Sequence, residues 1–293
     1  MKIIFIGSVE FSLNTLKAII DQGGDVVGIC TLKESSFNAD FCDLNDFAQS
    51  KNIPCLYIED INSQKSINWI SKFHPDVVFC FGWSRLLKKE LLSIAPLGVI
   101  GFHPAALPVN RGRHPIIWAI ALELKETAST FFFMDEGADT GDIISQKRIE
   151  ISKTDNAGTL YNRLTELAIN QIKEFLPLLQ KKSFERIKQD HSLANTWRKR
   201  TSKDGIIDWR MNANVINNLV RALTKPYIGA EFTYKNVQYK VWQSEVLPSK
   251  FQNDEPGKVV DVRGDSSFIK CADGIIHLVS IEPKLIVKKG DYL

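Results

Sequence analysis

The chain has 293 residues, of which 44% are hydrophobic and 24% are charged, so its composition is that of an ordinary globular protein. This length suits one large domain with one small one, and no segment has the composition of a disordered or repetitive chain. The net charge of +3 is too small to indicate a nucleic-acid partner by itself.

The chain begins with a short apolar run, MKIIFI, that ends at Gly7. This run is shorter than the apolar core of a signal peptide, and no later run is long enough to span a membrane. The five cysteines are scattered without C-x-x-C spacing, which favours reduced, structural thiols. We therefore expect a cytoplasmic protein.

Five short runs in the first hundred residues are typical of buried β-strands. They are rich in Val, Ile or Phe and are bounded by Gly, Asp or Pro: KIIFIG, DVVGIC, IPCLYI, DVVFCFG and GVIGFH. The stretches between them carry apolar residues three and four apart, as surface helices do. This alternation predicts a doubly wound α/β domain, Rossmann-like, on a mostly parallel sheet. Ligands of such sheets bind beyond the carboxyl ends of the strands, so the residues after DVVFCFG and GVIGFH are the first candidates.

A helix near 114–126, strands near 129–135 and 141–151, and a long helix near 160–179 complete a first domain, which we expect to span 1–180. Residues 181–204 read as a basic linker. From 181 to 210 the chain carries nine Lys or Arg against four Asp or Glu, so the positive excess is confined to this part. Residues 205–293 combine one helix near 215–223 with several extended runs, which predicts a small, β-rich, OB-like domain.

The turn GSVEF after the first strand raises the possibility of a dinucleotide site. The G-x-G-x-x-G fingerprint of such sites is absent, which disfavours a Rossmann dehydrogenase.

The segment from Gly98 to Asp142 holds the densest group of chemically informative residues. His103 directly follows a predicted buried strand and opens a loop with three prolines, which we expect to be rigid. Asp139 lies in a second Gly-rich turn, G-A-D-T-G, after the next strand. Two turns at the same end of neighbouring strands would bring the imidazole and the carboxylate together. In that geometry a carboxylate orients a histidine for proton transfer.

Simpler interpretations exist for each of these residues alone. A histidine after a strand is often a hydrogen-bonded loop residue, and Arg111 and Arg113 of the same loop could be solvated or paired with nearby acids. An acidic group in this segment lacks the spacing of a cation-binding loop, so we expect no metal at its members, Asp135, Glu136, Asp139 and Asp142. The conjunction of the motifs favours a catalytic site.

Two long motifs in this segment resemble those of the folate-dependent formyltransferase family, which includes enzymes acting on methionyl-tRNA, glycinamide ribonucleotide and nucleotide sugars. The loop H-P-A-A-L-P-x-x-R-G-R-H-P is similar to the family's His-containing loop, and M-D-E-G-A-D-T-G-D-I to its signature turn. MKIIFIGSVEFSLNTLKAII looks like the opening strand, turn and helix. DGIIDW and LVRALTKPYIGAEF resemble the start of the C-terminal domain in the tRNA and sugar enzymes. The resemblance covers almost the whole chain.

The resemblance implies that His103 and Asp139 are catalytic. His103 would receive the proton of the acceptor amine, and Asp139 would hold the ring and stabilise the imidazolium. The family's third catalytic residue is an Asn two positions before the histidine, thought to donate to the formyl oxygen, and here that position is Gly101. Losing one such donor typically costs about a hundredfold in rate. We expect a substitute donor, either the Gly101 backbone, protonated His103 or Asn110; an inactive binding protein is the alternative.

The resemblance also implies N10-formyltetrahydrofolate as the formyl donor and co-substrate. We expect the folate to contact the end of the fourth strand and the signature turn, at Phe81, Trp83, Arg85, Leu86, Leu87, Asp135 and Ala138. We expect the acceptor to contact the first turn and the His-containing loop, at Ser8, Glu10, Phe11, Asn110, Arg111, Gly112 and Arg113. The guanidinium groups of that loop suit phosphates.

Two acceptors compete. In relatives that act on tRNA, the region after the second strand is a basic insertion, whereas the corresponding KESSFNADFCDLND here has one Lys against four acidic residues and repels phosphate. The basic linker favours tRNA, although it could simply be solvated. The R-G-R-H-P sequence looks more like the sugar branch. We therefore expect a nucleotide-linked amino sugar, with methionyl-tRNA as the alternative.

Glycinamide ribonucleotide fits less well, because relatives that act on it lack the extra C-terminal domain. The β-rich C-terminal domain with its exposed edge is compatible with a homodimer.

Overall fold

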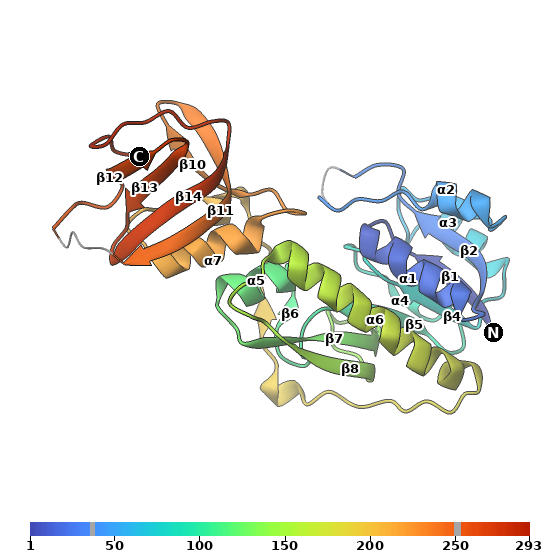
Figure 1. The fold of residues 1–293 in the computed structure, drawn as a ribbon. Helices are drawn as coiled ribbons and strands as arrows, with labels where there is room; N and C mark the ends of the chain where they lie inside the picture. Colours follow the sequence, from blue (N-terminus) through green and yellow to red (C-terminus); the bar gives the residue numbers. More distant parts are fainter. Residues whose placement is uncertain (36–38, 249–252) are drawn as a thin grey trace. The chain divides into compact units, whose positions relative to one another are not determined.

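The computed structural model of the protein describes residues 1–35, 39–248 and 253–293 (Figure 1). These residues form two compact units. The first contains Met1–Pro115, Thr127–Ile149 and Asn162–Trp197, and the second contains Ile116–Glu126, Glu150–Tyr161 and Arg198–Leu293. Two internal segments, 116–126 and 150–161, therefore pack with the C-terminal residues. The predicted division of the chain at residues 180 and 204 would assign both segments to the first domain, and it stays a prediction.

The first unit is built on a sheet whose seven described strands lie in the order β3-β2-β1-β4-β5-β7-β8. The pairs among the first five strands are parallel, and β7 runs antiparallel to β5. The strands are β1 (Lys2–Ile6), β2 (Asp25–Thr31), β3 (Cys55–Tyr57), β4 (Val77–Cys80), β5 (Val99–His103), β7 (Glu126–Phe133) and β8 (Ile143–Glu150). The predicted doubly wound, mostly parallel α/β fold is confirmed.

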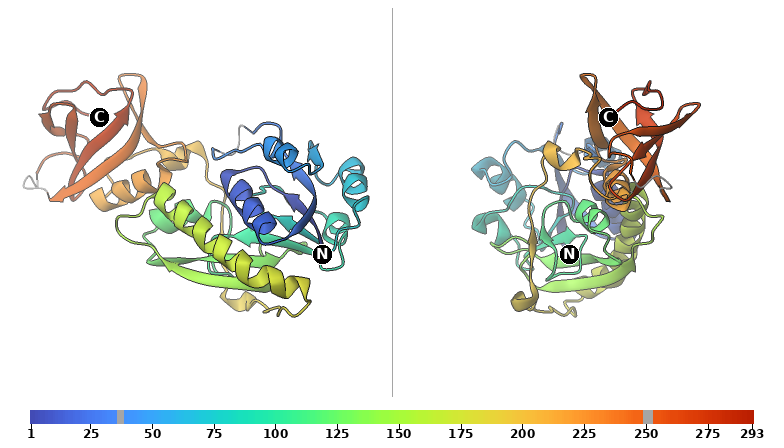
Figure 2. Two further views of the ribbon diagram at one scale, coloured as in Figure 1. Left: turned by 45° about the vertical axis from the view of Figure 1, so that its right-hand side comes forward. Right: turned by 90° about the vertical axis from the view of Figure 1, so that its left-hand side faces the viewer.

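Both faces of this sheet are covered by helices (Figures 1 and 2). On one face, Phe175 of α6 packs edge-on against Phe79 and at a tilt against Phe131 of the strands. On the other face, Ile70 and Leu91 belong to a buried cluster with alternate strand residues such as Ile4 and Ile6. This two-sided burial explains why the strands are continuously apolar. The helices of this part of the chain are α1 (Glu10–Asp21), α2 (Asn45–Ser50), α3 (Gln64–Ser71), α4 (Lys89–Leu92), α5 (Pro115–Ala121) and α6 (Ala157–Gln180).

The second unit contains an antiparallel sheet in the order β10-β11-β14-β13-β12 and the helix α7 (Ala213–Leu223), which packs on β11 and β14. Its strands are β10 (Ala230–Tyr234), β11 (Val237–Pro248), β12 (Val259–Arg263), β13 (Ser266–Lys270) and β14 (Gly274–Glu282). The guanidinium of Arg221 on α7 donates to the carbonyls of Ser152 and Asp155, at 3.3 and 2.7 Å, and holds the internal segment 150–161 in this unit. The expected C-terminal β-rich domain with one helix is confirmed.

The segment expected to be a linker is locally ordered. It contains the 3-10 turns η1 (His191–Leu193) and η2 (Ser202–Gly205) and the short strand β9 (Thr196–Trp197). β9 pairs in parallel with β6 (Arg111–Gly112), which lies in the loop after β5. Residues 181–197 therefore belong to the first unit, and β9 lies beside the loop that carries the predicted site.

All five cysteines are free. Burial raises the pKa of the Cys30 and Cys80 thiols and raises that of Cys271 to about 12, so these thiols stay protonated near neutral pH. Across the described ranges, no helix combines the length and the apolar character needed to cross a membrane.

Candidate active site

His103 is the last residue of β5 and is only 5% exposed. Its Nε2 lies 2.8 Å from the carbonyl oxygen of Asn110, which can only accept, so this nitrogen carries a proton in that contact. The sequence places His103 directly after the strand, at the start of the loop, whereas in the structure it is the last residue of the strand. The ring is held inside the protein by a residue seven positions along the chain.

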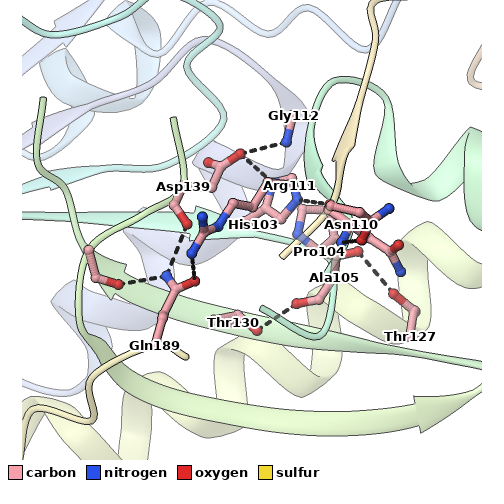
Figure 3. A network of polar contacts seen from close by, with 12 residues as sticks. His103, Pro104, Ala105, Asn110, Arg111, Gly112, Thr127, Thr130, Asp139 and Gln189 are labelled. Atoms are coloured by element: carbon pink, nitrogen blue, oxygen red, sulfur yellow. Dashed lines mark hydrogen bonds and ion pairs between the residues drawn. The ribbon is translucent and has the colours of Figure 1, made fainter. Parts of the chain in front are cut away.

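The loop that follows His103 is held at three of its carbonyls by the neighbouring strands, and Figure 3 shows the two contacts made by threonines. Thr127 and Thr130 of β7 donate their hydroxyls to the carbonyls of Pro104 and Ala105, at 3.1 and 2.7 Å. Gln146 of β8 donates its amide to the carbonyl of Leu107 at 2.9 Å. These bonds add to the prolines in restricting the loop.

Asp139 lies beside the histidine, as the sequence predicts. Its Oδ2 is 3.6 Å from Nδ1 of His103 and accepts a 2.8 Å hydrogen bond from the backbone N–H of Gly112. The backbone of Asp139 is left-handed, with φ +58°, and Asn110 on the opposite loop has φ +64°. Residues other than glycine adopt this backbone conformation uncommonly, although Asn and Asp do so more often than most. It persists where the surrounding structure holds it.

Gly112 is required by its position. Its φ is +100°, and a Cβ atom there would lie 2.3 Å from the backbone oxygen of Trp197 in β9. The close pairing of β6 with β9 therefore leaves no room for a side chain. It also turns the Gly112 N–H toward the Asp139 carboxylate.

The two arginines of the loop differ in their surroundings. Arg111 is 6% exposed, and its Nη2 contacts Oε1 of Gln189 at 2.6 Å and Nδ1 of His191 at 3.0 Å. Arg113 is half-buried and donates to the carbonyl of Ser84 at 2.7 Å. Arg111 is thus turned into the protein, whereas Arg113 reaches the loop after β4.

Gly101 lies within β5, where it pairs with Cys80 of β4 and Phe132 of β7. A Cβ atom there would lie 2.8 Å from Cγ and 3.0 Å from Sδ of Met134. Its backbone is not left-handed, so lack of space, and not conformation, explains the glycine. Because paired strands flank it on both sides, its peptide groups are used by the sheet.

The residues expected to bind folate lie at the end of β4 and in the loop after it. Phe81 is fully buried and stacks on Phe79, its N–H donates to the carbonyl of Ile6, and its carbonyl accepts from the hydroxyl of Ser12. A folate contact at Phe81 stays a prediction. Trp83 is half-buried, and its indole N–H has no hydrogen-bond partner among the described residues. Leu86 is 67% exposed, whereas Leu87 belongs to the buried cluster below. The folate contacts at Trp83, Leu86 and Leu87 stay predictions.

The remaining expected folate contacts are polar or lie in the signature turn. Arg85 donates to the carbonyl of Glu59 at 2.6 Å, and Ala138 is exposed. The carboxylate of Asp135 accepts from the N–H of Gly137 and the hydroxyl of Thr140, at 3.0 and 2.5 Å, and so shapes the turn that carries Asp139.

The turn after β1 contains the other residues expected to bind the acceptor. Ser8 is buried and its hydroxyl has no partner in the described part of the chain, while Glu10 is exposed. Phe11 is buried and stacks on Phe102 of β5, with ring centroids 4.2 Å apart. The Phe11 carbonyl accepts from the Thr15 hydroxyl at 2.8 Å, and an acceptor contact at Phe11 stays a prediction.

Sequence reasoning missed Gln189 and Asn195. The amide nitrogen of Gln189 donates to the carbonyls of Asp139 and Gly141, and the side-chain oxygen of Asn195 accepts from the N–H of Asn110 at 2.6 Å. Both residues lie in a segment whose composition indicates a solvated linker, so no local signal marks them. Within the described ranges, no three His, Cys, Asp or Glu side chains gather as they would around a metal ion.

Comparison with known proteins identifies the family of the chain. Residues 1–176 match the family model described as formyl transferase, and residues 199–289 match the model of the formyl transferase C-terminal domain. The chain is 30% identical to methionyl-tRNA formyltransferase of Caldanaerobacter subterraneus over 295 residues, covering 99% of this chain and 94% of that protein.

Two solved structures share the fold. One is WlaRD, a sugar 3N-formyltransferase with dTDP and 5-N-formyl-THF, at a TM-score of 0.71 and 20% identity, covering 97% of this chain and 99% of that one. The other is the N-formyltransferase of Helicobacter canadensis with folinic acid and dTDP-3-aminofucose, at 0.69 and 19%, covering 95% and 98%. Because the family models match both halves of the chain, the protein belongs to the formyl transferase family and is a folate-dependent formyl transfer enzyme.

Proposed function

We propose that the protein transfers the formyl group of N10-formyltetrahydrofolate to the amine of a nucleotide-linked amino sugar, with His103 and Asp139 at the reacting centre. The observation that carries the choice of acceptor is the acidic stretch between β2 and α2. The N–H of Glu10 donates to the carbonyl of Asp40, and the N–H of Cys42 donates to the carbonyl of Ser8, at 3.0 and 2.9 Å. This stretch is therefore fastened beside the turn expected to bind the acceptor.

The charge of this stretch disfavours a long polyanion. Residues 33–46 carry one Lys against one Glu and three Asp, although residues 36–38 among them lie outside the described residues. A nucleic acid presents one negative charge about every 1.7 Å of its duplex axis, so many phosphates would approach these acids. A nucleotide sugar carries few phosphates, which one or two arginines can bind.

Methionyl-tRNA is the second candidate, and a specific observation favours it. A relative at 30% identity over nearly the whole chain carries the name methionyl-tRNA formyltransferase, while the proteins that act on sugars share 20% identity or less. The positive excess between residues 181 and 210 points the same way.

A direct assay separates the two acceptors. The protein is incubated with N10-formyltetrahydrofolate and either a panel of nucleotide amino sugars or methionyl-tRNA, and the mass gain of one formyl group is measured. We expect formylation of an amino sugar, with a modest loss of rate as salt rises. Formylation of tRNA alone, with a log–log salt slope of several units, would replace the sugar proposal with the tRNA one.

The site residues suit the required proton transfer. N10-formyltetrahydrofolate supplies the formyl group, and the bond between the formyl carbon and N10 breaks when the acceptor nitrogen has attacked. During transfer the acceptor nitrogen loses one proton and N10 gains one, and His103 can carry that proton between them. Nε2 already donates to the Asn110 carbonyl, so Nδ1, which lies 3.6 Å from Asp139 and outside hydrogen-bond distance, is the nitrogen that would take up the proton. Both ring nitrogens of His103 face oxygen acceptors, on Asn110 and Asp139, and a neutral ring can donate to only one of them. The Asp139 carboxylate offsets the positive charge of the doubly protonated ring.

The group that replaces the missing Asn donor also follows from this arrangement. The peptide groups of Gly101 are used by the sheet, which leaves protonated His103 and the side-chain amide of Asn110 as candidates. We propose that protonated His103, whose ring is held by the Asn110 backbone carbonyl beside Asp139, stabilises the oxyanion in the transition state through its charge.

Installing Asn at position 101 is expected not to raise kcat and to lower stability by about 1–3 kcal/mol, because its Cβ overlaps Met134. Urea unfolding and steady-state kinetics measure both effects. In Gly101→Asn/Met134→Ala, where room is made, stability should recover in part. A clear gain in kcat for Gly101→Asn would instead mark the natural protein as an enzyme weakened by the loss of Asn.

Arg113→Ala is expected to raise the acceptor KM about tenfold or more while the folate KM changes little, because a charge-assisted hydrogen bond to phosphate is lost. Arg111→Ala should lower kcat instead, since Arg111 is turned toward Gln189. Kinetics with each substrate varied in turn measure both. An equal rise of both KM values in Arg113→Ala would assign Arg113 to holding the Ser84 loop and not to the acceptor.

A further inference from the structure

We propose that Gln189, on the segment after α6, is a positioning residue that fixes the conformation of the turn carrying Asp139. We propose also that residues 187–197 hold Gln189 and the His-containing loop in place. The inference rests on the proposed roles of His103 and Asp139. It assigns a function to a segment whose sequence indicates only a charged linker.

The side-chain amide of Gln189 joins three backbone or side-chain groups of the site (Figure 3). Its Nε2 donates to the carbonyl of Asp139 at 2.9 Å and to the carbonyl of Gly141 at 2.7 Å. Its Oε1 accepts from Nη2 of Arg111 at 2.6 Å. The residue is only 7% exposed. One planar group therefore links the signature turn to the His-containing loop.

Neighbouring residues of the segment fasten it on both sides of Gln189. Ile187 exchanges two backbone hydrogen bonds with Ile143 at the start of β8, at 2.8 and 2.9 Å. Asn195 accepts from the N–H of Asn110 through its side chain, at 2.6 Å, and from the N–H of Arg111 through its carbonyl, at 3.1 Å. The backbone on both sides of Gln189 is therefore hydrogen-bonded to the first unit, which fixes the position of its side chain.

Asp139 has a reason to need this anchor. Its left-handed backbone is costly for a residue other than glycine, and its carboxylate must reach both the Gly112 N–H and the His103 ring. Without the amide of Gln189, two carbonyls of the turn lose a donor and the turn can relax. A small displacement of the Asp139 carboxylate would change the orientation of the His103 ring. The rate of proton transfer is sensitive to that orientation.

Gln189→Glu tests the inference with almost no change of shape. The carboxylate still accepts from Arg111 but donates to neither carbonyl, and it faces both oxygens with a negative charge. We expect kcat to fall about tenfold or more, with both KM values changed by less than about threefold, because orientation of an acid–base group is lost while binding is not. Gln189→Leu, which adds no charge, should lower kcat similarly and covers the case in which Gln189→Glu fails to fold.

Gln171→Glu is the matched control. Gln171 lies in α6, is fully buried, and also donates twice, to the Ser129 carbonyl at 3.1 Å and the Ser145 hydroxyl at 2.8 Å. Its replacement should cost at least as much stability, because Oε1 of Gln171 has no partner among the described residues whereas that of Gln189 meets Arg111, and it should leave kcat of the folded enzyme intact. Equal losses of kcat in the Gln171 and Gln189 variants would overturn a specific positioning role.

A second measurement does not depend on turnover. In protein labelled with ¹⁵N at histidine, the ring signals of His103 are identified by their absence from His103→Gln. They should shift in Gln189→Glu and stay in place in Gln171→Glu. Unchanged ring signals, or a kcat within about twofold of wild type in Gln189→Glu, would overturn the inference. If His103→Gln keeps its activity, the proposed role of His103 fails instead, while the ring signals of the other variants still report on Gln189.

Discussion

Replacing His103 by Gln is expected to lower kcat by about 10²- to 10⁴-fold, which is the usual contribution of a positioned acid–base group. Gln is the better choice than Ala because His103 is buried and bonded to the Asn110 carbonyl, which an amide can still meet. Steady-state kinetics give kcat, and a thermal melt reports whether the fold survives. More than about a tenth of wild-type turnover in a folded variant would remove His103 from the chemistry.

Asp139→Asn is the partner of this prediction and separates charge from shape. The amide oxygen of Asn can still accept from the Gly112 N–H, but the negative charge beside the His103 ring is gone. We expect kcat to fall about a hundredfold or more, because the positive ring that forms during transfer loses its counter-charge. A kcat within about threefold of wild type would mean that Asp139 serves only to shape the turn.

Gly141→Ala is expected to have the largest effect on stability. A Cβ atom at Gly141 would lie 1.7 Å from the backbone oxygen of Phe133, which cannot move without disturbing the end of β7. We expect a loss of about 3 kcal/mol in the free energy of unfolding, at the upper end for overpacking. Activity should fall as well, because the Gly141 carbonyl is one of the two groups that Gln189 holds. Urea unfolding and kinetics on the folded fraction measure the two effects.

Gly205→Ala provides the control for this variant. The nearest atom to a Cβ there is 3.4 Å away, an ordinary contact, and the backbone of Gly205 is not left-handed. This substitution should change stability by less than about 1 kcal/mol. A loss of stability in Gly141→Ala no larger than that in Gly205→Ala would show that the turn adjusts to the extra atom.

Much of the fold could be predicted from local patterns. Each predicted strand of the first hundred residues is present, because a parallel sheet buried on both faces needs continuous runs of apolar residues. The C-terminal sheet and its helix were also predictable from extended runs and one amphipathic stretch. The meeting of His103 and Asp139 was predicted from two turns at the same edge of the sheet, and the two side chains do meet. The reason was wrong, because β7 runs antiparallel to β5, so the turn that carries Asp139 begins at the opposite edge, beside the start of β5.

The surroundings of those residues could not be predicted in the same way. The sequence places His103 and Arg111 in a Pro- and Gly-rich loop, which suggests exposure, yet both side chains are buried. Arg111 is held by β9 and Gln189, about eighty residues later in the chain, and His103 is held by Asn110 of its own loop and by Asp139. Neither β9 nor the sequence around Gln189 has a periodic pattern or a motif that would indicate a contact with the His-containing loop.

By itself, the sequence determined the order of strands and helices, the two long motifs and the departure at Gly101, because these depend on residue type and spacing along the chain. Only the tertiary structure decided that Met134 fills the space beside Gly101, that Arg111 is turned inward, and that Gln189 holds the Asp139 turn. The physical reason is that these contacts join segments distant in the chain. Single hydrogen bonds and van der Waals contacts between such segments leave no periodic trace in either one.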